Sequence, residues 1–254
     1  MNILISNDDG IKTEGIKALV KAMSQEADIY VVAPHVQRSA SSHALSVHGE
    51  ITLKEVEFEG AKKAYECDGT PADCVKLGID MLKQEGVKID AVYAGINHGG
   101  NLGTDTMYSG TVSAAAEGMI AGLPAVAVSV DSHSAVYFEA ACKLAVKVLP
   151  MAMRFGRKSV ISINTPNLPE KDIKGVKICK LGNLDYDQWF EKLSQEGLSR
   201  TYKYRGTPSE SEVWSDEMDI KMIRNGYATI SAVKYDLNDY DGLKEIERWG
   251  IDEN

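Results

Sequence analysis

The sequence predicts an α/β fold: a Rossmann-like, doubly wound, mostly parallel sheet followed by a C-terminal β/α oligomerisation extension. Short and almost continuously apolar runs alternate with helix-period segments over the first two-thirds of the 254 residues. Continuously apolar runs are typical of parallel strands that helices cover on both faces. Their alternation with helical segments is typical of right-handed β-α-β crossovers. After about residue 180 both patterns weaken, which indicates a different kind of structure there.

Five apolar runs are expected to form the central strands. Each is short and bounded by polar or turn-forming residues; they are residues 2–6, 29–33, 91–94, 125–130 and 160–163. Residues 51–58 alternate in part and could pair with residues 64–67 as a hairpin. A late strand is expected at 227–233.

The helices between these strands follow from apolar spacing and from capping residues. One apolar face consists of Ile16, Leu19, Val20 and Met23, and the segment 138–149 repeats this spacing over three turns. Another helix is expected from Pro71, because Thr70 can cap it, proline suits its first position and Asp73 completes a capping box.

The chain is expected to form one catalytic core, residues 1–180, with an extension at 181–254. We expect the extension to be an oligomerisation arm packed on the core and not an independent domain. An acidic stretch in it is expected to form a solvated face; its members are Glu210, Glu212, Asp216, Glu217 and Asp219.

Composition excludes several classes of function. A net charge of -9 disfavours binding to nucleic-acid polymers or to anionic membranes. No run reaches the roughly 18 apolar residues of a membrane helix, and the N-terminus lacks the basic region of a secretory signal. The four cysteines match no zinc spacing, so we expect them to be reduced in a cytoplasmic protein.

The first candidate site is the pair Asp8 and Asp9, which directly follows the first strand. Neighbouring strand residues point to opposite faces, but Gly10 allows a sharp turn that brings both carboxylates toward one point. Two negative charges at such a short distance repel each other unless a cation lies between them. Oxygen ligands suit Mg²⁺, Mn²⁺ or Ca²⁺ rather than zinc. The alternative is an ordinary turn in which Asp9 caps the next helix.

Two further loops are expected at the same edge of the sheet, because ligands bind beyond the carboxyl ends of the strands in such folds. Ser39 follows the second strand and Asn97 follows the strand at 91–94, and both could complete an oxygen cage. Serine-rich loops are common, however, and Asn97 could be only a turn residue. His43 and His98 lie in these loops and are candidate proton donors.

A helix that opens with Ser109, Gly110 and Thr111 is a candidate phosphate site. Free backbone N–H groups and the helix dipole attract anions at a helix N-terminus. The two hydroxyl groups add donors, and the glycine lets a ligand approach the backbone. The alternative is an ordinary capped helix.

Taken together, these segments resemble the SurE family of stationary-phase survival proteins, which act as metal-dependent 5'-nucleotidases. The resemblance rests on Ile5-Ser6-Asn7-Asp8-Asp9-Gly10, on Val32-Ala33-Pro34 with Ser39 beyond it, on residues 95–103 and on Tyr108-Ser109-Gly110-Thr111-Val112. It spans roughly residues 1–130, and residues 226–231 are similar to a late strand of the family.

The resemblance implies one divalent cation per subunit, Mg²⁺ or Mn²⁺, held by Asp8, Asp9, Ser39 and Asn97. It places substrate phosphate near Asn101, Ser109, Gly110 and Thr111. The implied substrates are nucleoside 5'-monophosphates and often 3'-monophosphates, with short polyphosphate in some members. The implied assembly is a homodimer or homotetramer in which C-terminal elements reach across subunits.

This chain departs from the family pattern at three places. Ala40 replaces the glycine that usually follows the loop serine, and Ser46 stands where a threonine is frequent. Ala232-Val233 replaces a common threonine-proline after the late strand. The first two changes bear on the closure of the second loop, and the third bears on the geometry of the arm.

The expected mechanism is metal-assisted hydrolysis of a phosphomonoester, in which Asp8 or Asp9 orients or deprotonates water. A phosphatase of the haloacid-dehalogenase type would need aspartates two positions apart, but position 10 is glycine. A dinucleotide-dependent dehydrogenase is disfavoured, since no G-x-G-x-x-G follows the first strand. A nucleotide-binding sensor without turnover is the alternative from another class.

Overall fold

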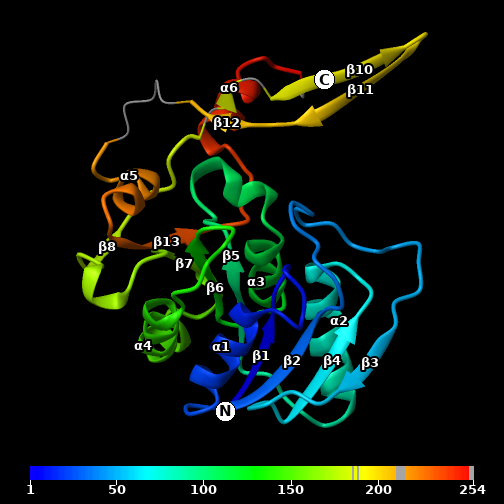
Figure 1. The fold of residues 1–254 in the computed structure, drawn as a ribbon, viewed down its shortest axis with the longest axis vertical. Coiled ribbons are helices and arrows are strands. Elements are labelled where there is room, and N and C mark those ends of the chain that lie inside the picture. Colours follow the sequence, from blue (N-terminus) through cyan, green and yellow to red (C-terminus); the bar gives the residue numbers. More distant parts are fainter. Residues whose placement is uncertain (185, 188, 210–214, 252–254) are drawn as a thin grey trace.

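A single large sheet organises the molecule (Figure 1). The computed structural model describes residues 1–184, 186–187, 189–209 and 215–251. The strands of the main sheet are β1 (Asn2–Ser6), β2 (Asp28–Pro34), β3 (Leu53–Val56), β4 (Lys63–Cys67), β5 (Ala91–His98), β6 (Ala125–Asp131), β7 (Val160–Pro166), β8 (Val176–Ile178) and β13 (Ala228–Val233). Their order in the sheet is β3-β4-β2-β1-β5-β6-β7-β13-β8.

Most neighbours in this sheet run parallel. The run from β4 through β2, β1, β5 and β6 to β7 is parallel throughout. β3 is antiparallel to β4, which confirms the expected hairpin, and β13 is antiparallel to β7. The predicted α/β class with a mostly parallel sheet is therefore confirmed.

Two helices cover each face of the sheet. The helices are α1 (Glu14–Met23), α2 (Pro71–Gln84), α3 (Gly110–Ile120) and α4 (Glu139–Phe155). One hydrophobic cluster contains the apolar faces of α1 and α4, and a second contains those of α2 and α3. The predicted capping box of α2 is present, because the Thr70 hydroxyl accepts from Asp73 N (3.1 Å) and the Asp73 carboxylate accepts from Thr70 N (2.9 Å).

The site loops meet where the order of the strands reverses. From β1 the chain adds β2 and β4 on one side, and then β5, β6 and β7 on the other. The loops that follow β1 and β2 and the end of β5 therefore share one edge of the sheet, the usual position of ligands in open α/β sheets.

Asn97 lies on a strand and not in the loop after it. The predicted strand ended at residue 94, but β5 continues to His98. Its pairing with β6 is regular up to Ala94, shifts, and resumes with Asn97 opposite Ser129. This irregularity changes the direction of the side chains at the end of β5, since a bulge breaks their strict alternation between the two faces.

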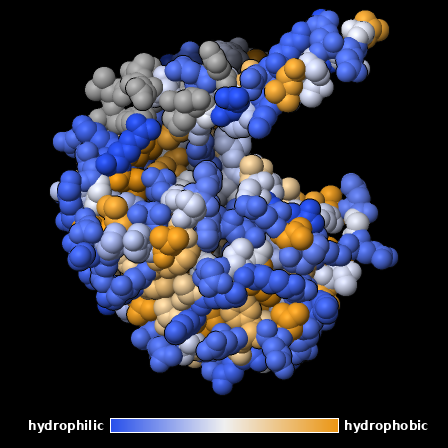
Figure 2. Space-filling view, viewed as in Figure 1, coloured by the Kyte–Doolittle hydropathy of each residue, from blue (hydrophilic) through white to orange (hydrophobic). Residues whose placement is uncertain are grey.

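The C-terminal extension contributes to the main sheet and also projects from it. Its other elements are β9 (Tyr186–Asp187), β10 (Phe190–Glu196), β11 (Ser199–Tyr204), β12 (Thr207–Pro208), α5 (Asp219–Arg224) and α6 (Tyr240–Glu247). Figure 1 shows the β10–β11 hairpin and α6 beyond the carboxyl ends of the central strands. In Figure 2 a wide notch separates the projecting hairpin from the body. β13 lies inside the main sheet, and the division at residue 180 stays a prediction.

The acidic stretch is only partly solvated, which corrects the sequence-based expectation. Asp216 and Glu217 are exposed and pair with Lys221 and Lys180, whereas Glu210 and Glu212 lie outside the described residues. Asp219 is fully buried. Its carboxylate accepts hydrogen bonds from two backbone N–H groups, those of Gly103 (3.0 Å) and Gly182 (2.9 Å).

Two further features concern the cysteines and the lengths of the helices. All four cysteines are free. In the described part of the chain, no helix combines the length and apolar character needed to cross a bilayer.

Candidate active site

Asp8 lies just beyond β1 and contacts the start of α3. Gly10 has φ +104°, a left-handed conformation that glycine adopts at little cost, and the chain turns there. Asp8 is 3% exposed. Thr111 donates to its carboxylate twice, from the hydroxyl to Oδ1 (2.5 Å) and from the backbone N–H to Oδ2 (3.1 Å). Asp8, one of the two predicted metal-binding carboxylates, therefore contacts the predicted phosphate segment directly through Thr111.

Asp9 points to a different set of neighbours. Its Oδ2 accepts from the backbone N–H of His98 (2.8 Å), and its Oδ1 accepts from Gln37 Nε2 (3.2 Å). The N-cap of α1 is Thr13, so the alternative of Asp9 as a helix cap is wrong. Asp9 instead links the loops that follow β1 and β2 with the end of β5.

The surroundings of Asp8 disfavour its negative charge. Burial raises its pKa, hydrogen bonds from Thr111 lower it, and the neighbouring Asp9 charge raises it; the resulting pKa is about 6. A buried carboxylate beside a second carboxylate is stabilised by a nearby positive charge.

Ser39 and Asn97 add a hydroxyl and an amide oxygen to the cavity that Asp8 lines, whereas Asp9 is not among its lining residues. Gln37 Nε2 donates to Ser39 Oγ (2.9 Å) as well as to Asp9, so one side chain bridges the two. Asn97 uses its amide nitrogen to donate to Gly99 O (2.7 Å), which leaves its carbonyl oxygen for a ligand. Asp8, Ser39 and Asn97 line one cavity.

The donor chemistry of this cluster fits a hard divalent cation. Carboxylate, amide and hydroxyl oxygens are the ligands that Mg²⁺ and Mn²⁺ accept. Within the described residues, no group of three or more His, Cys, Asp and Glu side chains is placed to hold a metal ion.

The N-terminus of α3 reaches the cavity through Ser109. The Ser109 hydroxyl accepts from Val112 N (3.0 Å), as in an ordinary capped helix, and its own proton remains available to donate. Thr111 N is bound to Asp8, which leaves the N–H of Gly110 among the first helical amides. A Cβ atom on Gly110 would lie 2.8 Å from Asp8 Cβ and 2.9 Å from Ser41 Oγ, so only glycine fits here without displacing Asp8 or Ser41.

Asn101 and Thr111, both predicted to bind phosphate, are buried and already have protein partners. Asn101 lines the cavity and donates from Nδ2 to Ser129 Oγ (2.8 Å). Thr111 directs both of its donors at Asp8. Their contact with substrate phosphate stays a prediction.

Comparison with known proteins identifies the family. The sequence profile described as "Survival protein SurE" matches residues 3–188. The chain belongs to the SurE family. It is 42% identical to the 5'-nucleotidase SurE of Clostridium beijerinckii over 254 residues, 98% of each chain. It is 41% identical to that of Pelotomaculum thermopropionicum, covering 98% of this chain and 95% of the relative.

The fold agrees with a solved SurE structure. The SurE protein from Aquifex aeolicus superposes with a TM-score of 0.84 at 32% identity, covering 98% of this chain and 99% of that one.

Two polar residues of this SurE-family site were missed by sequence reasoning. Gln37 bridges Asp9 and Ser39, as described above. The hydroxyl of Ser41 is buried and has no hydrogen-bond partner among the described residues, although it lies next to Gly110. Their only signal in the sequence was membership of the same serine-rich loop, which does not show which side chains face inward.

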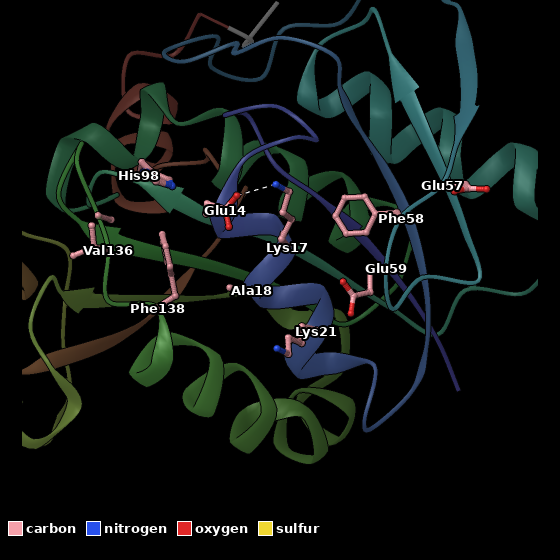
Figure 3. Close-up of a pocket in the computed structure, with 11 residues that line it drawn as sticks. Glu14, Lys17, Ala18, Lys21, Glu57, Phe58, Glu59, His98, Val136 and Phe138 are labelled. Atoms are coloured by element: carbon pink, nitrogen blue, oxygen red, sulfur yellow. Dashed lines mark hydrogen bonds and ion pairs between the residues drawn. The ribbon is translucent and has the colours of Figure 1, made fainter.

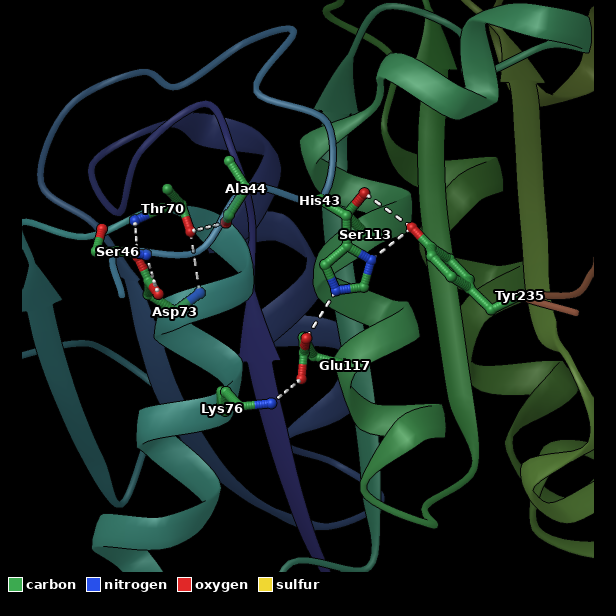
Figure 4. Close-up of polar contacts among 9 residues, drawn as sticks. All are labelled: His43, Ala44, Ser46, Thr70, Asp73, Lys76, Ser113, Glu117 and Tyr235. Carbon is green, nitrogen blue, oxygen red and sulfur yellow. Dashed lines mark hydrogen bonds and ion pairs between the residues drawn. The ribbon is translucent and has the colours of Figure 1, made fainter. Parts of the chain in front are cut away.

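His43 anchors the loop that carries Ser39 and Ser41 (Figure 4). Its Nε2 lies 2.7 Å from Glu117 Oε1, and its Nδ1 lies 2.6 Å from the Tyr235 hydroxyl. Both ring nitrogens therefore have protein partners. His43 does not line the main cavity, which is the one lined by Asp8, Ser39 and Asn97. These contacts hold the loop against α3 and do not point to a proton donor.

Glu117 is the centre of this anchor. It is 4% exposed and also pairs with Lys76 Nζ of α2 (3.1 Å). Burial raises the pKa of Glu117, but the hydrogen bonds and charges of His43 and Lys76 outweigh burial, and its pKa lies below the ordinary value.

Replacing Glu117 by alanine is expected to destabilise the protein by about 2 kcal/mol, because His43 and Lys76 lose their shared partner. The exposure of Lys76 limits the loss. Urea unfolding of Glu117→Ala and Glu117→Gln would measure it. The glutamine variant keeps one acceptor and should lose less; equal stability of all three proteins would contradict the assignment.

His98 borders a second cavity of about 790 Å³ on the α1 side of the sheet (Figure 3). The lining of that cavity mixes charges and apolar groups: Glu14, Lys17, Lys21, Glu57, Glu59, Phe58 and Phe138. The His98 ring packs against Phe138 at 5.3 Å, and its Nε2 has no partner among the described residues. His98 also lines the cavity that contains Asp8, Ser39 and Asn97, and its backbone N–H donates to Asp9.

Proposed function

We propose that this protein is a metal-dependent phosphomonoesterase that hydrolyses nucleoside 5'-monophosphates, and also 3'-monophosphates, to nucleoside and phosphate. The observation that carries the proposal is the direct contact between Asp8 and the N-terminus of α3, through Thr111. It joins the predicted carboxylate pair to the predicted phosphate segment. The name 5'-nucleotidase SurE of relatives that match over the whole chain supports the substrate class.

Asp8, Asp9, Ser39 and Asn97 would hold one divalent cation per subunit, Mg²⁺ or Mn²⁺. When bound, such a cation neutralises charge on phosphoryl oxygens and acidifies a water molecule.

The protein groups divide the remaining work. The Gly110 N–H, the Ser109 hydroxyl and Asn101 would bind the phosphoryl oxygens, and the helix dipole of α3 would favour their negative charge. Thr111 would hold Asp8 in place through the two hydrogen bonds described above. Asp8 or Asp9 would orient or deprotonate the attacking water.

A homodimer or homotetramer is the proposed assembly, with the 181–254 extension at the interface. The extension exposes many large apolar side chains, as oligomer interfaces do before they are covered. They include Leu193 and Leu198 of the hairpin region and Leu243, Ile246 and Trp249 of the α6 region.

Phosphate release from a panel of nucleoside monophosphates, with Mg²⁺, with Mn²⁺ and with EDTA, tests the activity. We expect release only with metal, and a loss of at least about 100-fold in Asp9→Asn, which lacks one of the two carboxylates. Full activity in EDTA would refute metal dependence. A trapped phosphoenzyme would instead favour an aspartyl-phosphate mechanism.

The second candidate is a nucleotide sensor that binds without turnover. Nucleotide binding by calorimetry, with no phosphate released under either metal, would support the sensor and overturn catalysis.

A further inference from the structure

The main cavity extends well beyond the predicted metal and phosphate groups. It has a volume of about 880 Å³, within the usual range of small-molecule sites. Asp8, Ser39 and Asn97 are among its lining residues. Four aromatic residues of the extension also line it and are here called the aromatic wall: Tyr186, Trp189, Phe190 and Tyr204.

The aromatic wall is a connected cluster that presents ring surface to the cavity. Trp189 contacts Tyr186 at 5.4 Å and Tyr204 at 6.4 Å between ring centroids, and Phe190 contacts Tyr204 at 5.5 Å. Trp189 is nevertheless 47% exposed and Tyr204 is 55% exposed. Large aromatic surface left open inside a cavity is suited to packing against another flat ring.

The wall is fixed to the catalytic edge by hydrogen bonds. The short helix η1 (Gly103–Tyr108) connects the loop that follows β5 with the start of α3. Asp105 of η1 accepts a hydrogen bond from the Tyr186 hydroxyl. Thr104 exchanges two hydrogen bonds with Leu184, one to its carbonyl (2.9 Å) and one from its N–H (3.2 Å).

Buried Asp219 strengthens this attachment. It binds the N–H of Gly103 on η1 and the N–H of Gly182, which leads into the wall. The same short helix thus positions the phosphate segment at its end and the aromatic wall at its side.

We infer that the aromatic wall is a nucleobase-stacking subsite that accepts purines and pyrimidines with little discrimination. The inference rests on the proposed function, and it names the part of the substrate that the aromatic wall recognises. Base stacking on aromatic rings tolerates different bases, because each base has a π-face. Arg205 also lines the cavity, but it is paired with Glu191 (2.7 Å), which leaves it less free to donate to the edge of a base.

The decisive comparison uses two substrates that share the phosphorylated ribose, AMP and ribose 5-phosphate. In the wild-type protein, kcat/KM should be about 10-fold or more higher for AMP, because only AMP carries a base to stack. In Trp189→Ala this preference should fall about 10-fold, mainly through the KM for AMP. Trp189→Phe, which keeps a ring, should recover most of it.

Tyr202→Ala is the matched control. Tyr202 lies on β11 with Tyr204 and is similarly exposed, but it does not line the cavity. It should leave the AMP preference unchanged. Equal wild-type rates for the two substrates, or an equal loss for both in Trp189→Ala, would overturn the subsite.

Binding separates this inference from the proposed function. If neither substrate is hydrolysed with Mg²⁺ or Mn²⁺, the proposed function fails, and calorimetric titration with adenosine, which lacks phosphate, still tests the wall. Weaker adenosine binding by Trp189→Ala than by the wild type and Tyr202→Ala supports the subsite. Equal affinities, or no adenosine binding by the wild type, overturn it.

Discussion

Replacing Asp8 by asparagine should raise the free energy of unfolding of the metal-free protein at pH 7 by up to about 3 kcal/mol while removing metal-dependent phosphate release. Burial, opposed by the Thr111 hydrogen bonds and reinforced by the Asp9 charge, raises the pKa of Asp8 from 3.8 to about 6. The folded protein therefore holds a charge at pH 7 that the unfolded chain solvates better. Asparagine removes that charge, although its NH₂ group loses one of the Thr111 contacts, which limits the gain.

The direction of the pH dependence follows from the raised pKa. A group whose pKa is higher in the folded state stabilises the fold fully below its unfolded pKa, here about 3.8, and that contribution is lost as the pH rises through about 6. The advantage of Asp8→Asn should thus be small near pH 4 and reach its full size above pH 6. Urea unfolding in EDTA across this range, with activity measured on the same preparations, would show it.

Asp73→Asn is a control of opposite sign. Burial raises the pKa of Asp73, but hydrogen bonds from Thr70 and Ser46 outweigh burial and lower it overall. Asparagine weakens that capping box and should cost about 1 kcal/mol at pH 7. If Asp8→Asn also lowered the free energy of unfolding, the destabilisation assigned to the buried Asp8 charge would be wrong.

The parts of the fold that were predictable depend on local patterns. β1 coincides with the expected run 2–6, because a buried parallel strand is apolar along its whole length. The β10–β11 hairpin was not predicted. Nearly all of its side chains are exposed, so no alternation of apolar and polar residues marks it.

The positions of site residues that directly follow a strand were predictable. Those set by contacts with residues far away in the sequence were not. Asp8 and Asp9 lie at the predicted edge of the sheet, because the carboxyl end of β1 fixes their position. Asp219 was placed on the surface, but its burial depends on backbone groups 116 and 37 residues away, which no local pattern shows. The inward position of Ser41 depends on its loop, where Ala40 and Ser42 both have positive φ.

Gly15→Ala is expected to cost about 3 kcal/mol or more in stability and to weaken metal binding. Helix propensity alone would favour alanine by about 1 kcal/mol. At this position, however, a Cβ atom would lie 2.0 Å from the carbonyl oxygen of Ile96. The oxygen is a backbone atom of β5, and the backbone of α1 fixes the position of the Cβ atom. The helix and the strand must therefore separate, and the shift acts on the residue next to Asn97.

Two glycine controls separate packing from the metal site. Gly49→Ala meets no atom within 4 Å and should change stability by less than about 0.5 kcal/mol. Gly118→Ala places a Cβ atom 2.5 Å from Val92 Cβ, so it should also destabilise the fold. Val92 lies near the start of β5, far along the strand from Asn97. Calorimetric titration with Mn²⁺, at a temperature where all variants are folded, should therefore show weaker binding in Gly15→Ala than in Gly118→Ala. Equal affinities would mean that the end of β5 keeps its geometry despite the clash, and that α1 moves instead.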